Sequence, residues 1–309
     1  MDSKIIRNDL EQIFEKIYNK DYFKDWVKNF GLNLNDIWNE SSAEILKNNQ
    51  KLTEKSAIVI GRGPSVKKNK HLETLVNSSY EGVIVCCDGM LISALESGIT
   101  PDRFPDFYVV TIDGAEKISK FYDHKVVKRF GNKIKGIFST VSNPKTVSIA
   151  RDAGIKIHWV HSLLDYEEGE KSFNSLSSIM VRSKNHTEGI PAIQTGGNVG
   201  TSSWFVSWKI LGCKTVTLIG IDHSWEDNEP LSNLIHHFHL PPNIEEGSPL
   251  FRKVFPKIYN PDLDKFCILD PTFKYYSEAL KEFISRSPDW LTTINATANK
   301  INCPAINAE

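Results

Sequence analysis

From residue 56 onward, short apolar runs of four to six residues alternate with longer amphipathic stretches. This alternation is typical of βαβ units, in which buried parallel strands are joined by helices that cover the sheet. We expect strands at residues 57–60, 83–87, 107–112, 136–139, 155–160 and 216–219, and helices at 72–76, 91–97, 145–153 and 202–211. The pattern therefore predicts an α/β fold, a Rossmann-like open and mostly parallel sheet flanked by helices.

Two further regions flank this predicted Rossmann-like domain, which spans residues 52–225. Residues 1–51 have apolar side chains at helical spacing and are expected to form an N-terminal helical segment. Residues 226–309 contain a loop or lid excursion rich in Pro, Asn, His and acidic residues, followed by a C-terminal helical return with a helix at 275–284. An excursion beside strand ends is typical of a substrate lid, and a disordered insert is the alternative.

Charge and hydropathy exclude several classes of protein. The chain has 309 residues, with 37 Lys and Arg against 38 Asp and Glu, and a formal charge of −1. Proteins that coat nucleic acid normally carry a basic surplus, so this balance argues against a nucleic-acid polymer as partner. No run approaches the ~20 apolar residues that span a bilayer, and the N-terminus lacks a secretory apolar stretch. We expect a cytoplasmic protein without a membrane span, and the sequence leaves a homo-oligomer open.

Small and polar residues follow the predicted strands. In an open parallel sheet, ligands bind beyond the carboxyl ends of the strands, where backbone amides and helix starts converge. The residues at these ends are Gly61-Arg62-Gly63-Pro64-Ser65, Asp88-Gly89, Asp113-Gly114, Ser139-Thr140 and Gly220-Ile221-Asp222-His223. We therefore expect a small-molecule site along this edge of the sheet.

The first of these turns suits a phosphate group. Gly61 and Gly63 let the backbone approach a ligand, Pro64 restricts the chain and Ser65 can cap the next helix. The turn, with Arg62 inside it, lacks the third glycine of the dinucleotide fingerprint and the Gly-Lys-Ser/Thr of a Walker loop. A nucleotide-binding turn and a purely structural βα turn therefore both remain open.

A second glycine cluster, Thr195-Gly196-Gly197-Asn198, precedes the helix predicted at 202–211. Its amides, hydroxyl and side-chain amide could bind a further part of an anionic or sugar-like ligand. The alternative is close packing of the helix on the sheet.

Three carboxylates each follow a predicted strand: Asp88, Asp113 and Asp222. Carboxylates that converge at one edge can hold Mg²⁺ against phosphate oxygens or accept hydrogen bonds from ribose. A single Asp after a strand often caps a helix instead, and the occurrence of three favours a site.

The histidines offer one further group, at residues 236, 237 and 239 of the excursion. No cysteine or regular ligand spacing accompanies them, so a solvent-facing loop is the simpler interpretation than a metal site. His223, directly after Asp222, is a candidate general base or phosphate contact.

Taken in order, these motifs resemble the archaeal 6-hydroxymethylpterin diphosphokinase (MptE-like) family. The resemblance covers roughly residues 25–225 and rests on the runs at 58–65, 87–89, 98–102 and 110–114. It implies transfer of diphosphate from ATP to the hydroxymethyl group of a dihydropterin, with Mg²⁺ as cofactor and AMP as product. The pterin enzymes carry a Thr-Asp-Leu-Asp-Gly run, whereas this chain has Thr111 in place of the first carboxylate. Metal binding would then be weaker, or completed by Asp88 or Asp222.

On this interpretation the site residues take separate parts. Gly61, Arg62, Gly63, Pro64, Ser65 and Gly89 would hold the nucleotide, and Asp88 and Asp113 would position Mg²⁺ or the ribose. Thr195, Gly196, Gly197 and Asn198 would complete the nucleotide site. Asp113, Asp222 and His223 are the expected catalytic residues, the last two facing a pterin or sugar-like acceptor.

The same superfamily includes motility-associated glycosyltransferases and resembles the bacterial family 42 sialyltransferases. Those proteins share the Gly-x-Gly-Pro-Ser turn and a Gly-Ile-Asp run like residues 220–222. A nucleotide-sugar glycosyltransferase, with a donor other than ATP, is therefore the second hypothesis. A non-catalytic nucleotide-binding protein is the third.

Overall fold

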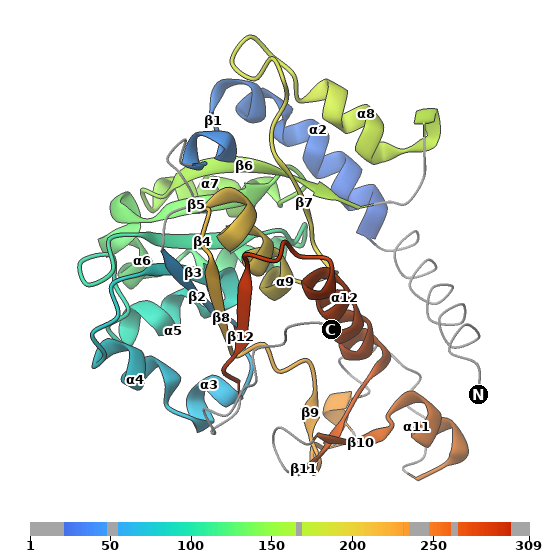
Figure 1. Ribbon diagram of the computed structural model, residues 1–309. Coiled ribbons are helices and arrows are strands. Elements are labelled where there is room, and N and C mark those ends of the chain that lie inside the picture. The colour runs from blue at the N-terminus through green and yellow to red at the C-terminus, as the bar shows by residue number, and fades with distance from the viewer. Residues whose placement is uncertain are drawn as a thin grey trace.

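The computed structural model describes residues 22–47, 55–164, 169–230, 232–234, 247–260 and 265–297. Within these residues the main sheet has nine strands in the order β1-β6-β5-β4-β3-β2-β8-β12, with β7 paired to β6 (Figure 1). All of its strand pairs are parallel. The strands are β1 (Ser41–Ser42), β2 (Ser56–Ile60), β3 (Val83–Cys87), β4 (Phe107–Thr111), β5 (Lys135–Ser139), β6 (Lys156–Leu163), β7 (Ala192–Gln194), β8 (Thr215–Ile219) and β12 (Thr292–Asn295).

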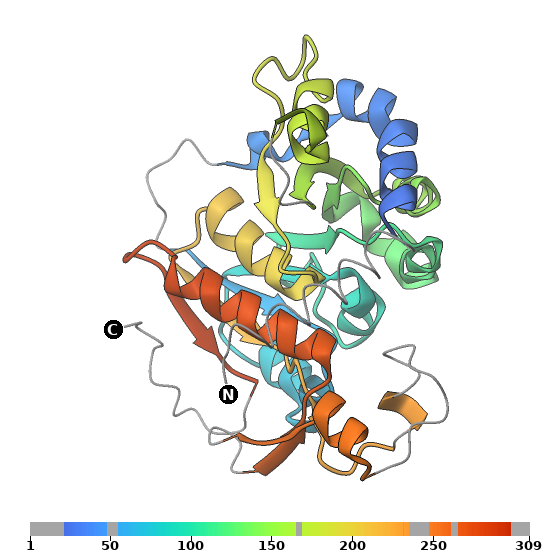
Figure 2. The same ribbon diagram turned by 90° about the vertical axis from the view of Figure 1, so that its right-hand side faces the viewer.

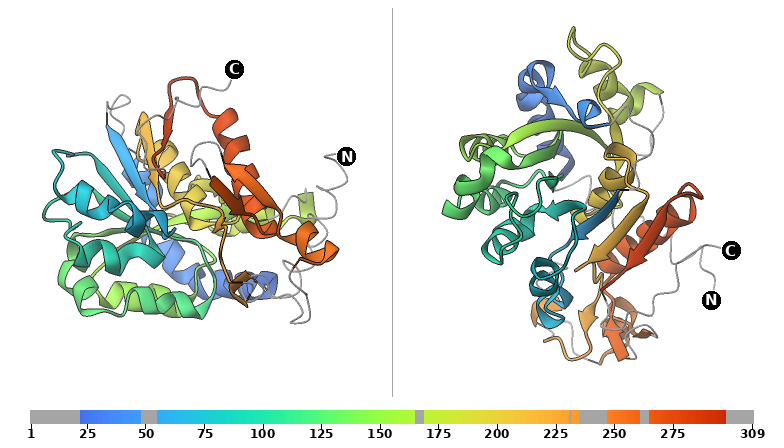
Figure 3. Two further views of the ribbon diagram at one scale, coloured as in Figure 1. Left: turned by 90° about the horizontal axis from the view of Figure 1, so that it is seen from below. Right: turned by 60° about the vertical axis from the view of Figure 1, so that its left-hand side comes forward.

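Helices cover both faces of this sheet because its strands are apolar on both sides. One core contains Ile84 and Cys86 of β3, and the opposite core contains Val83 and Val85 of the same strand. The first face is covered by α2 (Phe23–Asn39), α4 (His71–Val76), α5 (Leu91–Glu96), α6 (Lys125–Phe130) and α7 (Pro144–Asp152). The second is covered by α9 (Val199–Phe205), its π-helical continuation η7 (Val206–Ile210) and α12 (Pro271–Ser285). The right-hand view of Figure 3 shows these two layers on either side of the sheet. The predicted Rossmann-like α/β class is confirmed.

The order of the strands creates a switch point between β2 and β8. From β2 the chain adds β3, β4, β5 and β6 in one direction, and then returns to place β8 on the other side of β2. Ligands in such sheets bind beyond the carboxyl ends at this point, because the loops on either side diverge there. The turn after β2 and the loop after β8 are therefore the natural walls of a site.

Helix α2, from the N-terminal part of the chain, packs against the loops at the carboxyl ends of the strands. Its buried Asn29 donates to the backbone oxygens of Gly114 and Val141, at 2.9 and 3.1 Å. One turn later, Asn33 donates to the backbone oxygens of Thr140 and Ser142. The two asparagines thus bind the loops that follow β4 and β5. The expected N-terminal helical segment is present in residues 23–39, and residues 1–21 lie outside the described part.

Part of the predicted excursion folds into a second, antiparallel sheet. It consists of β9 (Trp225–Glu226), β10 (Lys257–Asn260) and β11 (Lys265–Ile268), with α11 (Pro249–Val254) beside it. The chain then returns through α12, which packs beside α9 (Figure 2) through a ring contact between Phe283 and Phe205 at 5.2 Å.

Strands from outside residues 52–225 also join the main sheet, namely β1 from the N-terminal side and β12 from the C-terminal end. The boundaries predicted for the three regions stay predictions. In the described residues no helix is both long and apolar enough to cross a membrane.

Candidate functional site

The turn after β2 is hydrogen-bonded to the loop after β8. Three alternate backbone amides of the turn donate to the last residue of β8 or to the loop after it, and so join the two chain segments at the switch point. The pairs are Gly61 N to Ile219 O at 2.8 Å, Gly63 N to Gly220 O at 2.8 Å, and Ser65 N to Asp222 Oδ2 at 3.0 Å. These amides are therefore already used within the protein.

The same contacts explain why the turn contains glycines. A Cβ at Gly63 would overlap the Asp222 carboxylate, and a Cβ at Gly61 would overlap Gly220 O. Gly220 itself has φ +67° and lies against Gly61. The glycines were expected to let a ligand approach the backbone closely. In the structure it is the loop after β8 that approaches them closely. A role of residues 61–65 in nucleotide binding stays a prediction. Arg62 and Pro64 are the exposed residues of the turn, and of these two only Arg62 has a polar side chain.

Ser65 does not cap α3 (Ser65–Lys68) as the sequence indicated, whereas Pro64 has the restricted backbone expected of it, with φ −60°. The N-cap is Pro64, without a side-chain hydrogen bond, and Ser65 is the first helical residue. Asp222 binds the Ser65 amide in place of a capping side chain. Burial raises the pKa of Asp222, although the Ser65 amide opposes this shift. Asp222 is therefore a structural link between the two loops.

Asp88 lies at the end of β3 in a buried hydrogen-bond network. It is 5% exposed and accepts from the Gly89 amide at 2.6 Å and from the Thr111 hydroxyl at 3.1 Å. While Asp88 is ionised, Thr111 donates to it, so the Tyr122 hydroxyl then donates to Thr111, at 2.5 Å. Burial raises the pKa of Asp88 to about 7, and the negative charge of Asp113 adds to this shift. At neutral pH this carboxyl group is therefore poised between its two protonation states.

Asp113 follows the adjacent strand β4 and is half-buried. Its Oδ1 accepts from the Ala115 amide at 2.8 Å. Its charge acts on Asp88, so these two carboxylates are neighbours, as predicted from their strand-end positions. The absent first carboxylate of the family motif is thus replaced by a threonine that hydrogen-bonds to Asp88.

Arg62 reaches across the end of β3. A Cβ at Gly89 would lie 3.1 Å from Arg62 Cδ and 3.5 Å from the Phe121 ring. The guanidinium carbon lies 5.5 Å from the centre of that ring. Gly89 therefore makes room for the arginine beside Asp88. Phe121 was not predicted as a site residue, and no sequence signal marks it.

The second glycine loop packs against α12. Gly196 and Gly197 have φ of +54° and +79°, and a Cβ at Gly197 would lie 2.6 Å from the Tyr276 ring and 3.1 Å from the Tyr275 ring. Thr195 accepts the Gly197 amide at 3.2 Å. Asn198 is the N-cap of α9 and accepts the Thr201 amide at 2.9 Å. The polar groups of this loop thus mainly shape the loop itself.

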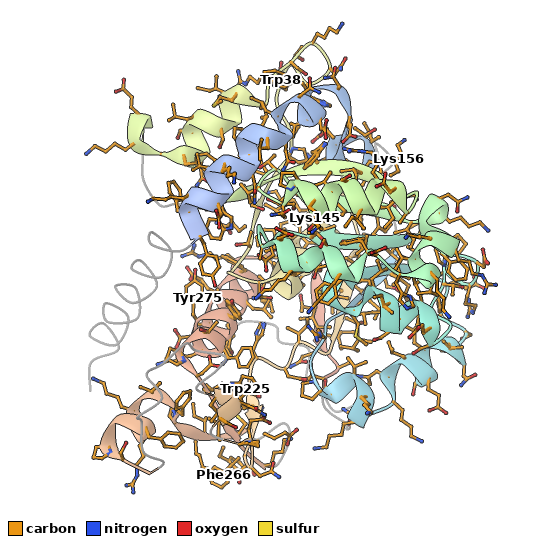
Figure 4. All side chains as sticks on the ribbon, turned by 180° about the vertical axis from the view of Figure 1, so that it is seen from behind. Trp38, Lys145, Lys156, Trp225, Phe266 and Tyr275 are labelled. Carbon is orange, nitrogen blue, oxygen red and sulfur yellow. The ribbon has the colours of Figure 1, made fainter. Side chains whose placement is uncertain are left out.

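His223 lies among aromatic rings of α12. Its ring centroid is 5.8 Å from that of Tyr276 and 6.5 Å from that of Phe273, and its backbone has φ +43°. Burial lowers the pKa of His223 to about 4, so the imidazole is neutral at physiological pH. Figure 4 labels one aromatic residue of α12, Tyr275, and Trp225, whose ring contacts that of Phe273 at 5.2 Å.

Tyr276 connects the two parts of the site. Burial raises its pKa, and the charges of Asp113 and Asp270 raise it further. Tyr276 therefore lies near Asp113 as well as near His223 and Gly197. The aromatic run at residues 273–276 was a signal in the sequence, but the distance along the chain hid its connection with β4.

The predicted site residues thus form three connected groups. Arg62, Gly89, Asp88 and Asp113 lie together, Asp222 binds the first turn, and His223 and the second glycine loop contact α12. The histidines at 236, 237 and 239 lie outside the described residues. Within the described ranges, no three His, Cys, Asp or Glu side chains are grouped as metal ligands.

The chain matches the family described as 6-hydroxymethylpterin diphosphokinase MptE-like over residues 28–228. Among solved structures, the MAf glycosyltransferase from Magnetospirillum magneticum AMB-1 is similar, with a TM-score of 0.53 at 14% sequence identity. The match covers 88% of this chain and 40% of the glycosyltransferase chain, so this chain spans less than half of that protein. At this identity the likeness concerns the fold. No curated protein matches the sequence.

The strand-end motifs on which the resemblance rests, at residues 58–65, 87–89, 98–102 and 110–114, all lie inside the matched range. The parallel sheet brings three of these strand ends to one edge, beside the switch point. The resemblance to the pterin family is confirmed, and the fold is similar to that of a MAf glycosyltransferase. The chain belongs to the 6-hydroxymethylpterin diphosphokinase MptE-like family.

Proposed function

We propose that this protein is a transferase that moves diphosphate from ATP to the hydroxymethyl group of 6-hydroxymethyl-7,8-dihydropterin. The observation that carries the proposal is the carboxylate pair Asp88 and Asp113 next to Arg62, at the carboxyl ends of β3 and β4. Phosphoryl transfer needs positioning and charge neutralisation more than a protein nucleophile. This combination of a paired acid and an arginine meets that need.

The carboxylate pair is suited to Mg²⁺. Magnesium in such sites is commonly held by one or two carboxylates and completed by substrate phosphates and water, so a group of three protein ligands is not required. The charge of Asp113 disfavours ionisation of Asp88, and a cation between them would reverse this effect. Asp88 and Asp113 would therefore hold Mg²⁺. When bound, this ion would neutralise charge on the phosphates of ATP.

The remaining residues would bind and orient the two substrates. The acceptor hydroxyl would form a bond to the β-phosphorus, the bond from that phosphorus to the α-phosphate oxygen would break, and AMP would leave. His223 is neutral because burial lowers its pKa, and its ring could accept a hydrogen bond from the acceptor hydroxyl and so orient it. The rings of Tyr276 and Phe273 beside it would offer a stacking surface for a planar acceptor.

A nucleotide-sugar glycosyltransferase is the second candidate. The structural match to the MAf glycosyltransferase covers 88% of this chain, which is more than the family range of residues 28–228. It therefore extends into regions outside that range. A sugar-nucleotide donor would use the same edge of the sheet.

The test combines a binding panel with a product assay. The melting temperature is measured with ATP, CMP, UDP and CMP- or UDP-sugars, with and without Mg²⁺, because a ligand that binds the native state raises it. AMP release is then measured with ATP, Mg²⁺ and hydroxymethyldihydropterin. We expect stabilisation by ATP with Mg²⁺, and AMP release that Asp113→Asn reduces. Stabilisation by CMP and not ATP, with hydrolysis of a nucleotide-sugar, would favour the glycosyltransferase. Stabilisation without any turnover would indicate a non-catalytic nucleotide-binding protein.

A further inference from the structure

We propose that Arg62 and Lys120, whose charged groups both lie near the ring of Phe121, form a binding site for a diphosphate group. The proposal rests on the proposed function in one respect, that the donor is a nucleotide. It goes further by assigning a binding site to the diphosphate part of the donor and by adding two residues outside the predicted set, Lys120 and Phe121.

Arg62 is held in place by apolar contacts and keeps its hydrogen-bonding capacity. Its stem passes over Gly89, and its guanidinium lies 5.5 Å from the centre of the Phe121 ring. Within the described residues the guanidinium makes no ion pair or hydrogen bond. The neighbouring Asp88 accepts from Thr111 and Gly89, and no hydrogen bond joins it to the guanidinium. An arginine held against a ring, with no direct hydrogen bond to a carboxylate, keeps its donors free for a ligand anion.

Lys120 places a second cation on the same ring. Its Nζ lies 5.2 Å from the centre of Phe121, and the residue is exposed on the 3-10 helix η4 (Glu116–Phe121). Three other lysines nearby have carboxylate partners: Lys145 pairs with Glu116 at 2.6 Å, Lys128 with Asp123 at 2.9 Å and Lys133 with Asp102 at 2.6 Å. Among the described residues Lys120 has none, and neither has Lys117 of the same helix.

Two cations within 6 Å of one ring centroid suit a ligand with at least two negative groups. Arginine can bind a phosphate through two parallel hydrogen bonds, while lysine acts as a point charge. A diphosphate supplies one phosphoryl group for each cation. A nucleoside monophosphate, the leaving group of a CMP-sugar, could engage both cations only through its single phosphate. The site therefore favours donors with a diphosphate.

The experiment measures binding of inorganic pyrophosphate by calorimetry, with inorganic phosphate as the smaller anion. The variants are Arg62→Gln and Lys120→Gln, and the matched control is Lys117→Gln, which removes an exposed lysine of η4 that has no ring contact. We expect Arg62→Gln and Lys120→Gln each to weaken pyrophosphate binding by about tenfold, as for the loss of one charge-assisted interaction, and the control to change it less than twofold. Circular dichroism checks that each variant is folded.

Phe121 is a positioning residue, and its variant separates position from charge. Phe121→Leu should weaken pyrophosphate binding while leaving the slope of log affinity against log salt unchanged, because both cations remain. Arg62→Gln and Lys120→Gln should make this slope shallower. Equal effects of Lys120→Gln and Lys117→Gln, tighter binding of phosphate than of pyrophosphate, or no pyrophosphate binding would overturn the proposal.

These outcomes differ from failure of the proposed function. Without AMP release, pyrophosphate binding that depends on Arg62 and Lys120 would leave the diphosphate site standing and remove the pterin reaction. AMP release with normal pyrophosphate binding in both variants would leave the reaction standing and remove the site.

Discussion

Replacing Gly63 by alanine tests the contact between the loops after β2 and β8. The added Cβ would overlap the Asp222 carboxylate, with Cγ at 2.6 Å, and would lie 2.8 Å from Gly220 O. Carbon and oxygen atoms that are not bonded do not approach so closely. Either the carboxylate must leave the Ser65 amide or the loop after β8 must shift.

The cost can be estimated from the two contacts. Loss of the hydrogen bond from Ser65 N to the ionised Asp222 costs about 1.5–3 kcal/mol. Displacement of the packed backbone around Gly220 adds about 1–3 kcal/mol, as for other overpacked sites. We therefore expect Gly63→Ala to lower the free energy of unfolding by about 3–5 kcal/mol, a large share of the total for a typical domain.

Gly31→Ala is the matched control. Gly31 lies within α2, and a Cβ there meets no atom within 4 Å. Alanine is favoured over glycine inside a helix by about 0.5–1 kcal/mol, so this variant should be slightly stabilised. The same substitution should therefore lower the free energy of unfolding at Gly63 and raise it at Gly31.

Urea unfolding followed by circular dichroism measures both effects. A double-mutant cycle with Asp222→Ala locates the cause, since removal of the carboxylate removes most of the overlap. The double variant should be more stable than the sum of the single effects implies, by at least about 1 kcal/mol. An unchanged free energy of unfolding in Gly63→Ala, or strictly additive effects in the cycle, would refute the explanation given for this glycine.

Three further predictions concern pH and the docking of α2. Because the pKa of Asp88 is raised to about 7 in the folded state, the stability it contributes is fully present below pH 3.8 and is lost as the pH rises towards 7. Asp88→Asn should thus resemble the wild type near pH 4 and exceed its unfolding free energy by roughly 2–4 kcal/mol at pH 8, measured without metal; a difference independent of pH would contradict this. His223 should give an NMR ring resonance that titrates near pH 4 and is absent in His223→Gln, and a midpoint near 6.5 would show that the imidazole is not desolvated. Asn33→Ala should cost about 2–3 kcal/mol in urea unfolding because two carbonyls lose their buried partner, whereas the exposed Asn35→Ala should cost little; equal costs would argue against this docking.

The strands that the sequence predicted well are those buried on both faces. β2, β3 and β4 were expected within one residue of their observed ends, because central parallel strands are nearly continuous apolar runs. β1 and β12 were not identified as strands. β1 has only two serines and β12 reads Thr-Thr-Ile-Asn, so neither has a strong apolar signal, and each becomes a strand through pairing with a neighbour already in the sheet.

Some features of the candidate site were also predicted from the sequence, and others were not. The neighbouring positions of Asp88 and Asp113 followed from their places after adjacent strands. The replacement of the missing motif carboxylate by a Thr111 and Tyr122 network did not, because Tyr122 lies on a different segment. The aromatic surroundings of His223 come from α12, some fifty residues further along the chain.

Local sequence was sufficient to indicate the α/β class and the edge of the sheet at which small polar residues gather, since apolar periodicity and turn residues act over a few positions. The partners of those polar residues depended on the order of the strands. The Ser65 amide and Asp222 are 157 residues apart in sequence and meet only because β8 lies beside β2. That contact uses the turn amides within the protein. It leaves the side chain of Arg62, rather than the amides of residues 61, 63 and 65, available to a ligand.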